Sequence, residues 1–83
     1  MAKKTTFERI REILVEQLNH DENQITPETN IVWDLGADSL DCTEITIAME
    51  DEFEIAIDDE AMEKCHIVQE LVNLIDRLKT TNG

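Results

Sequence analysis

Apolar residues recur at steps of three and four along three stretches of this 83-residue chain, a periodicity typical of amphipathic helices. The first predicted helix begins at Thr5 or Thr6, because Thr5 and Glu8 stand at the spacing of a capping box. The last begins near Ile67 or Val68, and residues 80–83 are expected to fray at its end. The stripes that we expect these two helices to bury are Phe7, Ile10, Ile13, Leu14 and Leu18 in the first and Val68, Leu71, Val72, Ile75 and Leu78 in the last.

The middle stretch predicts a helix from Ser39 to Phe53 or Glu54 that carries two apolar stripes. One recurs every four residues and is expected to face the core, with Cys42 adjoining: Ile45, Met49 and Phe53. The other is expected to face away from it, among acidic side chains: Leu40, Thr43 and Ile47. For Ile47, ordinary core packing and an exposed contact both stay open, since isolated apolar residues are common on protein surfaces.

A short third helix is predicted over Glu60–Lys64, because the preceding run Ile55-Ala56-Ile57 is too short and too isolated to predict a strand. The connection Asn19–Ala37 contains Pro27 and Gly36, and a loop of this length in a compact domain is usually either functional or wrongly assigned. Four of its apolar residues can pin it to the core: Ile25, Ile31, Val32 and Leu35. The pattern predicts an all-α fold in a single domain over residues 1–83, a four-helix bundle with three longer helices, one short third helix and a long loop between helices one and two.

The charge of the chain limits its partners. The net charge is −13, and 17 Asp or Glu but no Lys or Arg lie between Glu12 and Glu63. This distribution attracts basic protein surfaces and argues against nucleic acid and anionic membranes, because both of these need cationic patches. No stretch has the length and apolar character of a membrane span, and the charged start lacks the apolar core of a secretory signal. We expect a monomer.

The cysteines and acids predict no metal centre. Cys42 and Cys65 match neither a zinc spacing nor a redox pair, which indicates reduced thiols and a cytoplasmic location, although a bridged or reactive pair stays an alternative. No window meets the EF-hand pattern. The most that we predict is weak, non-obligatory binding of divalent cations by neighbouring acids: Asp34 with Asp38, or Glu50 with Asp51 and Glu54.

One serine stands where a loop is expected to become a helix. Asp38 suits the N-cap of the second helix, and Asp41 lies three residues further on, as a reciprocal cap requires. Ser39 then takes the first helical position with its hydroxyl outward, where helix amides and the helix dipole favour a phosphate ester. Neither His20 nor His66 has a spacing that ties it to this serine, and the flanking glycines of a hydrolase nucleophile elbow are missing, so no catalytic residue is predicted.

The run from Asp34 to Asp41 resembles the attachment motif of acyl carrier proteins, in which the serine bears 4'-phosphopantetheine. The similarity extends over nearly the whole chain, through residues 16–18, 26–28, 44–45, 48–54, 57–60 and 63–64. It implies the same four-helix bundle, and a freestanding carrier that is not an enzyme. In such a carrier a phosphopantetheinyl transferase moves 4'-phosphopantetheine from coenzyme A to Ser39, which Asp38 and Leu40 flank. The arm then presents acyl chains to acyl-transferring and chain-elongating enzymes of fatty-acid synthesis that carry basic patches.

The resemblance also implies two sets of contact residues. The partner-binding surface would lie on the second helix and comprise Asp38, Leu40, Asp41, Thr43, Glu44, Ile47, Glu50 and Asp51. In similar carriers the acyl chain can slip between the helices, and the candidates to line such a pocket are Ile45, Met49, Ile57, Met62, Cys65 and Leu71. For each of these six, plain core packing is the alternative role.

The sequence departs from the family at several positions. Trp33 replaces a small polar or charged residue, and is either a contact for partners or the arm, or a half-buried loop anchor. Thr43 and Ile47 stand where relatives often have Val and Met, and Asp58 replaces a frequent proline, which should loosen the turn into helix three. His66-Ile67 replaces a Thr-rich N-cap, a loss that typically costs about 1 kcal/mol. These changes leave open a specialised carrier for polyketide, lipid A-related or amino-acyl chemistry. From another class, an acidic interaction module never modified on Ser39 also stays open.

Overall fold

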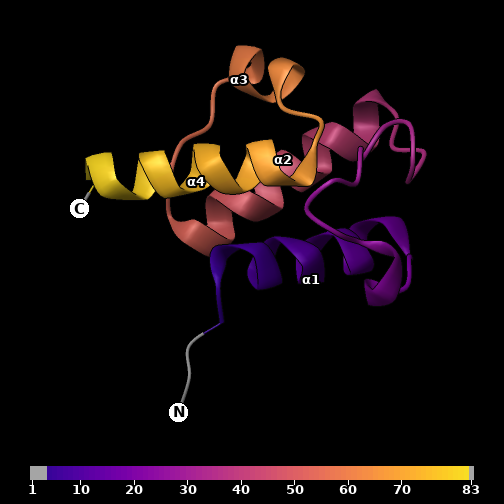
Figure 1. The fold of residues 1–83 in the computed structure, drawn as a ribbon. Coiled ribbons are helices and arrows are strands. Elements are labelled where there is room, and N and C mark those ends of the chain that lie inside the picture. Colours follow the sequence, from indigo (N-terminus) through magenta and orange to yellow (C-terminus); the bar gives the residue numbers. More distant parts are fainter. Residues whose placement is uncertain (1–3, 83) are drawn as a thin grey trace.

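The computed structural model describes residues 4–82, with side chains described as far as Lys79, and this part of the chain is helical without strands. Its elements are α1 (Thr6–Leu18), a short 3-10 helix η1 (Glu22–Gln24), α2 (Ser39–Phe53), α3 (Asp59–Lys64) and α4 (Val68–Asn82). Figure 1 shows three longer helices, the short α3 and the long connection between α1 and α2. The predicted all-α fold is therefore confirmed. None of the described helices is long and apolar enough to cross a membrane.

The helix starts follow their predicted caps. Thr5 caps α1, because its hydroxyl accepts the Glu8 amide at 3.1 Å while the Glu8 carboxylate accepts the Thr5 amide at 3.0 Å. The third helix begins at Asp59, one residue earlier than predicted. The backbone of α4 is helical as far as Asn82, fraying of this end stays a prediction, and Gly83 lies outside the described residues. Both α1 and α2 end in a left-handed residue, Asn19 and Glu54.

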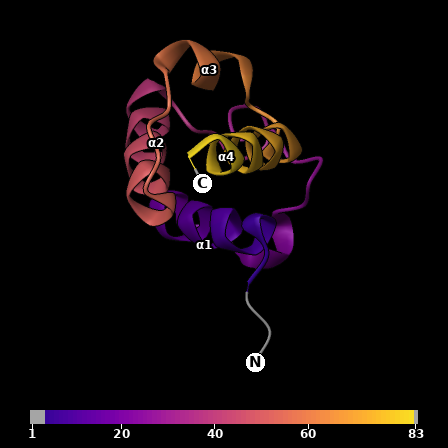
Figure 2. The same cartoon turned by 90° about the vertical axis from the view of Figure 1, so that its left-hand side faces the viewer.

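The core lies where α1 packs against both α2 and α4 (Figures 1 and 2). Each stripe predicted to face the core contributes to it. Of the four loop residues expected to pin the loop, Ile25, Ile31 and Leu35 are buried and Val32 is half-buried. Phe7, Leu18, Val72 and Leu78 lie at its border and are partly buried. The completely buried side chains, with exposed fractions near zero, are Ile10, Leu14, Ile31, Ile45, Met49, Val68, Leu71 and Ile75.

The long loop caps α4 with main-chain atoms. The Val68 amide donates to the carbonyl oxygen of Thr29 at 2.9 Å, and the Gln69 amide donates to that of Pro27 at 2.9 Å. The Ile31 amide in turn donates to the His66 oxygen at 2.8 Å. The loop thus satisfies amides of the first turn of α4 that a threonine hydroxyl would otherwise satisfy, and the cost expected from the missing threonine cap stays a prediction. These bonds also fix the loop that leads toward Ser39.

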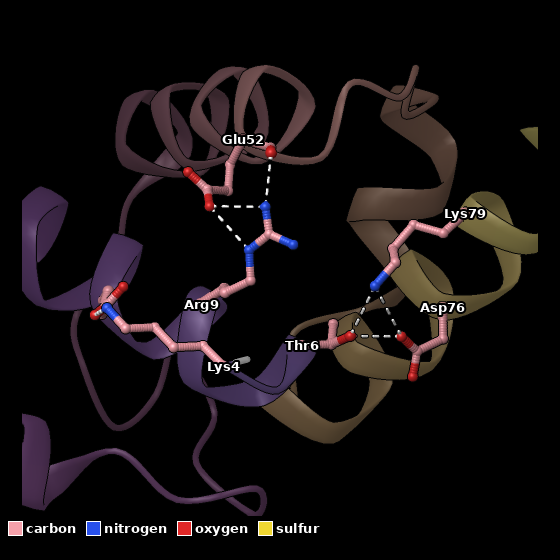
Figure 3. A network of polar contacts seen from close by, with 7 residues as sticks. Lys4, Thr6, Arg9, Glu52, Asp76 and Lys79 are labelled. Atoms are coloured by element: carbon pink, nitrogen blue, oxygen red, sulfur yellow. Dashed lines mark hydrogen bonds and ion pairs between the residues drawn. The ribbon is translucent and has the colours of Figure 1, made fainter. Parts of the chain in front are cut away.

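Cations near the two ends of the chain join three helices (Figure 3). Arg9 of α1 pairs with the Glu52 carboxylate at 2.9 Å and donates to the Glu52 main-chain oxygen at 2.9 Å, near the end of α2. The Arg9 guanidinium lies 4.4 Å from the centre of the Phe53 ring, and Lys79 of α4 lies 5.6 Å from it. Lys79 also donates to the Thr6 hydroxyl at 3.2 Å. These contacts balance part of the repulsion within the acidic chain.

Candidate functional site

A capping box fixes the first turn of α2. The Asp41 amide donates to the Asp38 carboxylate at 2.9 Å, and the Asp38 amide donates to the Asp41 carboxylate at 3.2 Å. Ser39 is the first residue of the helix and its side chain is exposed. The Thr43 hydroxyl donates to the Ser39 carbonyl oxygen at 3.0 Å, a contact with the main chain and not with the serine hydroxyl. The predicted geometry of cap and serine is thus present.

The turn before the helix is also fixed. Gly36 has a φ of 73°, a left-handed conformation that glycine adopts without strain. A Cβ there would meet nothing within 4 Å, so it is the backbone angle and not lack of space that favours glycine. The Gly36 amide donates to the Val32 oxygen at 3.1 Å and the Ala37 amide to the Ile31 oxygen at 2.9 Å. The chain therefore reaches Asp38 along one defined path.

A hollow of about 840 Å³ opens beside Ser39. Its walls come from α2, α3 and the loops next to them, and Ser39 is itself one of the lining residues. Four of the lining side chains are acidic and one is a histidine, and the others are apolar or small. The complete lining is Val32, Ala37, Asp38, Ser39, Cys42, Thr43, Thr46, Ile47, Glu50, Ile57, Asp59, Met62, Glu63 and His66.

The six candidate pocket residues divide into two groups. Ile57 and Met62 line the hollow. Ile45, Met49 and Leu71 are completely buried in the core, and Cys65 is half-buried outside the hollow's lining. Sequence reasoning proposed none of the other lining residues as pocket residues. Cys42, Thr46 and His66 could have been proposed as lining residues from the sequence, since they are small or polar residues on or beside the predicted helices.

The proposed partner-binding residues lie on one long surface of α2. Leu40 and Ile47 are 65% and 59% exposed, so the core-packing alternative for Ile47 is wrong. Asp38, Thr43, Glu44 and Asp51 are exposed as well, whereas Asp41 and Glu50 are half-buried. A second hollow of about 480 Å³ lies beside this surface, lined by Gln17, Glu44, Ile47, Ala48 and Asp51.

Glu50 has a structural role that the sequence did not reveal. Its carboxylate accepts the Ile57 amide at 2.8 Å, and its main-chain oxygen accepts the Ile55 amide at 3.1 Å. Both bonds join α2 to the segment before α3. Glu50 and Ile57 also line the hollow. Glu50 therefore holds one wall of the hollow in place.

The two cysteines and the clustered acidic residues are the remaining candidate groups from the sequence. Cys42 and Cys65 are free thiols, so they form no disulfide bridge. Burial raises the pKa of both thiols, and the carboxylates of Asp41 and Asp38 raise the pKa of Cys42 further. No group of three His, Cys, Asp or Glu suited to a metal ion occurs in the part of the chain that the structure describes. Weak cation binding by pairs of acids stays a prediction.

A family model described as a phosphopantetheine attachment site matches residues 8–75. The chain therefore belongs to this family of phosphopantetheine-carrying domains. Such domains are non-catalytic carriers, and their cofactor is 4'-phosphopantetheine, bound covalently. The residues at the start of α2 fit this group, since the Ser39 hydroxyl is exposed and the Ser39 and Leu40 amides donate to no acceptor in the described chain. Unpaired amides at a helix N-terminus favour a phosphate.

Proposed function

We propose that this chain carries acyl groups on a 4'-phosphopantetheine arm attached to Ser39 and presents them to enzymes of fatty-acid synthesis. The observation that carries the proposal is the position of Ser39, which is exposed at the first turn of α2 and also lines the hollow of about 840 Å³. A serine so placed is accessible to a modifying enzyme and stands next to space for the attached group. The family match supports the nature of the group.

In this proposal the chain's own residues position Ser39 and do not catalyse the attachment of the arm. Asp38 and Asp41 each accept a main-chain amide, which holds the first turn and the serine in one orientation. No histidine, lysine or carboxylate hydrogen-bonds to the Ser39 hydroxyl in the described chain, so activation of the hydroxyl is left to a phosphopantetheinyl transferase that uses coenzyme A. When bound, the arm supplies a terminal thiol that carries acyl groups as thioesters.

The partner-binding surface supports a carrier that visits several basic enzymes in turn. Its exposed acids, Asp38, Glu44 and Asp51, surround the apolar residues Leu40 and Ile47. Exposed ion pairs contribute little each, so they orient and accelerate docking without preventing release. Asp41 and Glu50 add negative charge to the same helix. We place this function in the cytoplasm, on a monomer with reduced thiols.

A specialised carrier for polyketide, lipid A-related or amino-acyl chemistry is the second candidate. It is favoured by the exposed Trp33, Thr43 and Ile47, where the surface differs from the family pattern. Comparing the acylation of the loaded chain by enzymes of each pathway distinguishes the two candidates.

The test of the attachment site is the intact mass of the chain after incubation with coenzyme A and a phosphopantetheinyl transferase. The wild type should gain the mass of one phosphopantetheine group, and Ser39→Ala should gain none. Thr46→Ala is the matched control, because it removes another hydroxyl that lines the hollow, lies outside the partner-binding surface and should still gain the group. An unmodified wild type, or a modified Ser39→Ala variant, would show that the proposal is wrong.

A further inference from the structure

Trp33 is the most exposed large apolar residue in the described chain, at 84% of its surface. Leu40 and Ile47 follow at 65% and 59%, and both already belong to the partner-binding surface on α2. The loop-anchor alternative for Trp33 is therefore wrong. An exposed indole contributes little to folding, and tryptophan is a residue type favoured at the centres of binding interfaces.

The turn that carries Trp33 is held rigidly. The side-chain oxygen of Asn30 accepts the amides of both Val32 and Trp33 at 2.9 Å. The carboxylate of Asp34 accepts the Asn30 amide at 2.8 Å, and the Asp34 amide donates back to the Asn30 carbonyl oxygen at 2.8 Å. A rigid aromatic side chain loses little conformational freedom on binding, which favours affinity.

The same turn lies at the edge of the candidate site. Ile31 and Leu35 on either side of it are buried at 0% and 8% exposure, which anchors both ends. Val32 lines the hollow together with Ser39, and Trp33 is the next residue of the same turn. Trp33 and Leu40 thus place exposed apolar surface on the two chain segments that flank Ser39.

The negative charges close to Trp33 in the chain favour a partner with basic side chains. Asp34 and Asp38 are exposed nearby in the chain, and no Lys or Arg occurs between Glu12 and Glu63. An indole beside carboxylates suits an arginine or lysine side chain, which gains a cation–π contact and an ion pair together. A second copy of this chain fits poorly, because each copy has a net charge of −13.

We propose that Trp33 is a docking contact for an arginine- or lysine-bearing surface of the enzymes that act on Ser39. The contact extends the partner-binding surface from α2 to the turn of residues 31–35. The proposal rests on the proposed carrier function, since it takes those enzymes as the partners. It assigns a specificity-determining role to a residue that the attachment itself does not require.

The test uses the single tryptophan of the chain as its own reporter. The chain is produced with 5-fluorotryptophan, which gives one ¹⁹F resonance, and is titrated with unlabelled phosphopantetheinyl transferase without coenzyme A at low salt. We expect the resonance to shift as the transferase binds, until the chain is saturated. The Kd from this titration should equal the Kd that calorimetry gives for the same two proteins. Trp33→Ala should raise this Kd by about three- to tenfold, and Trp33→Phe by less, because phenylalanine keeps a weaker aromatic face.

Controls separate this inference from the proposed function. Asn73→Ala alters an exposed residue of α4 and should leave the Kd unchanged. Given enough enzyme, Trp33→Ala should still gain one phosphopantetheine group, because Ser39 is intact. If the ¹⁹F resonance does not shift when the transferase binds, or if Trp33→Ala leaves the Kd unchanged, the inference is wrong while the carrier function stands. If the resonance shifts when the arm is attached but not when the transferase binds, Trp33 contacts the arm, and the inference is also wrong. Absence of both binding and modification overturns the two proposals together.

Discussion

Replacing Glu50 by alanine should destabilise the fold, because it removes the acceptor of the Ile57 amide. That hydrogen bond is 2.8 Å long, and Ile57 is only 7% exposed, so water replaces the lost carboxylate poorly. Leaving a buried donor without a partner costs about 1–3 kcal/mol. We take the lower part of this range for Glu50, since its side chain is only half-buried.

Two further effects of the alanine substitution act in the opposite direction. Alanine is a better helix former than glutamate, by at most about 0.5 kcal/mol, and loss of one negative charge relieves repulsion in an acidic chain. Glu50→Gln loses the same charge but keeps a side-chain oxygen that can accept the Ile57 amide. The difference between the Ala and Gln variants therefore measures the hydrogen bond. We expect the Ala variant to be less stable than the Gln variant by about 1 kcal/mol, or about 4–8 °C in Tm for a domain of this size.

Urea and thermal unfolding followed by circular dichroism measure this difference. Glu44→Ala and Glu44→Gln form the matched control pair, because Glu44 is an exposed glutamate of the same helix. Their difference should show only the helix propensity, with the Ala variant equal or slightly more stable. Hydrogen exchange of the Ile57 amide should accelerate in Glu50→Ala and not in Glu44→Ala. If the Ala–Gln difference is the same at both positions, Glu50 does not hold the wall of the hollow.

Three other perturbations test separate parts of the structure. Arg9→Ala should lower the unfolding free energy by about 1–2 kcal/mol in urea titrations, with Arg9→Lys in between, because it removes an ion pair, a main-chain hydrogen bond and the cation over Phe53. Charge reversal at Glu44 and Asp51 should slow modification by a transferase, and the effect should shrink as salt rises; unchanged rates at low salt would contradict electrostatic steering. In a Cys65→Ser background, Cys42 should react with iodoacetamide more slowly than a peptide cysteine at neutral pH. Its pKa is raised, so less thiolate is present, and mass spectrometry should show the rate increasing as the pH rises toward that pKa.

The features that could be predicted from the sequence are those set by residues close together in the chain. Both capping boxes join residues three positions apart, Thr5 with Glu8 and Asp38 with Asp41, so their spacing alone identifies them. The apolar stripes likewise follow from helical periodicity. The position of Ser39 at the start of α2 required nothing beyond these local signals.

The features that the sequence did not reveal join residues whose distance depends on the tertiary fold. The amide of Val68 is capped by the carbonyl oxygen of Thr29, and no side-chain pattern encodes a main-chain acceptor. Glu50 reaches the Ile57 amide only because the chain turns back after α2. The pocket candidates were divided for a similar reason. Periodicity predicts that Ile45 and Met49 face inward, but it does not distinguish a closed core from the wall of a hollow.

The two walls of the hollow beside Ser39 are held by contacts of unequal strength. The α2 wall has four buried residues behind it and a capping box at its first turn. In α3 the buried residue is Met62, and the N-cap Asp58 makes no side-chain capping bond in the described chain, while the looser turn expected where a proline is replaced stays a prediction. If the chain carries acyl groups as proposed, the wall held by fewer contacts is the one that we expect to adjust to cargo of varying size. The segment before α3 is joined to α2 through the carboxylate and the main-chain oxygen of Glu50, so we expect Glu50→Ala to loosen this wall and leave the first turn of α2 unchanged.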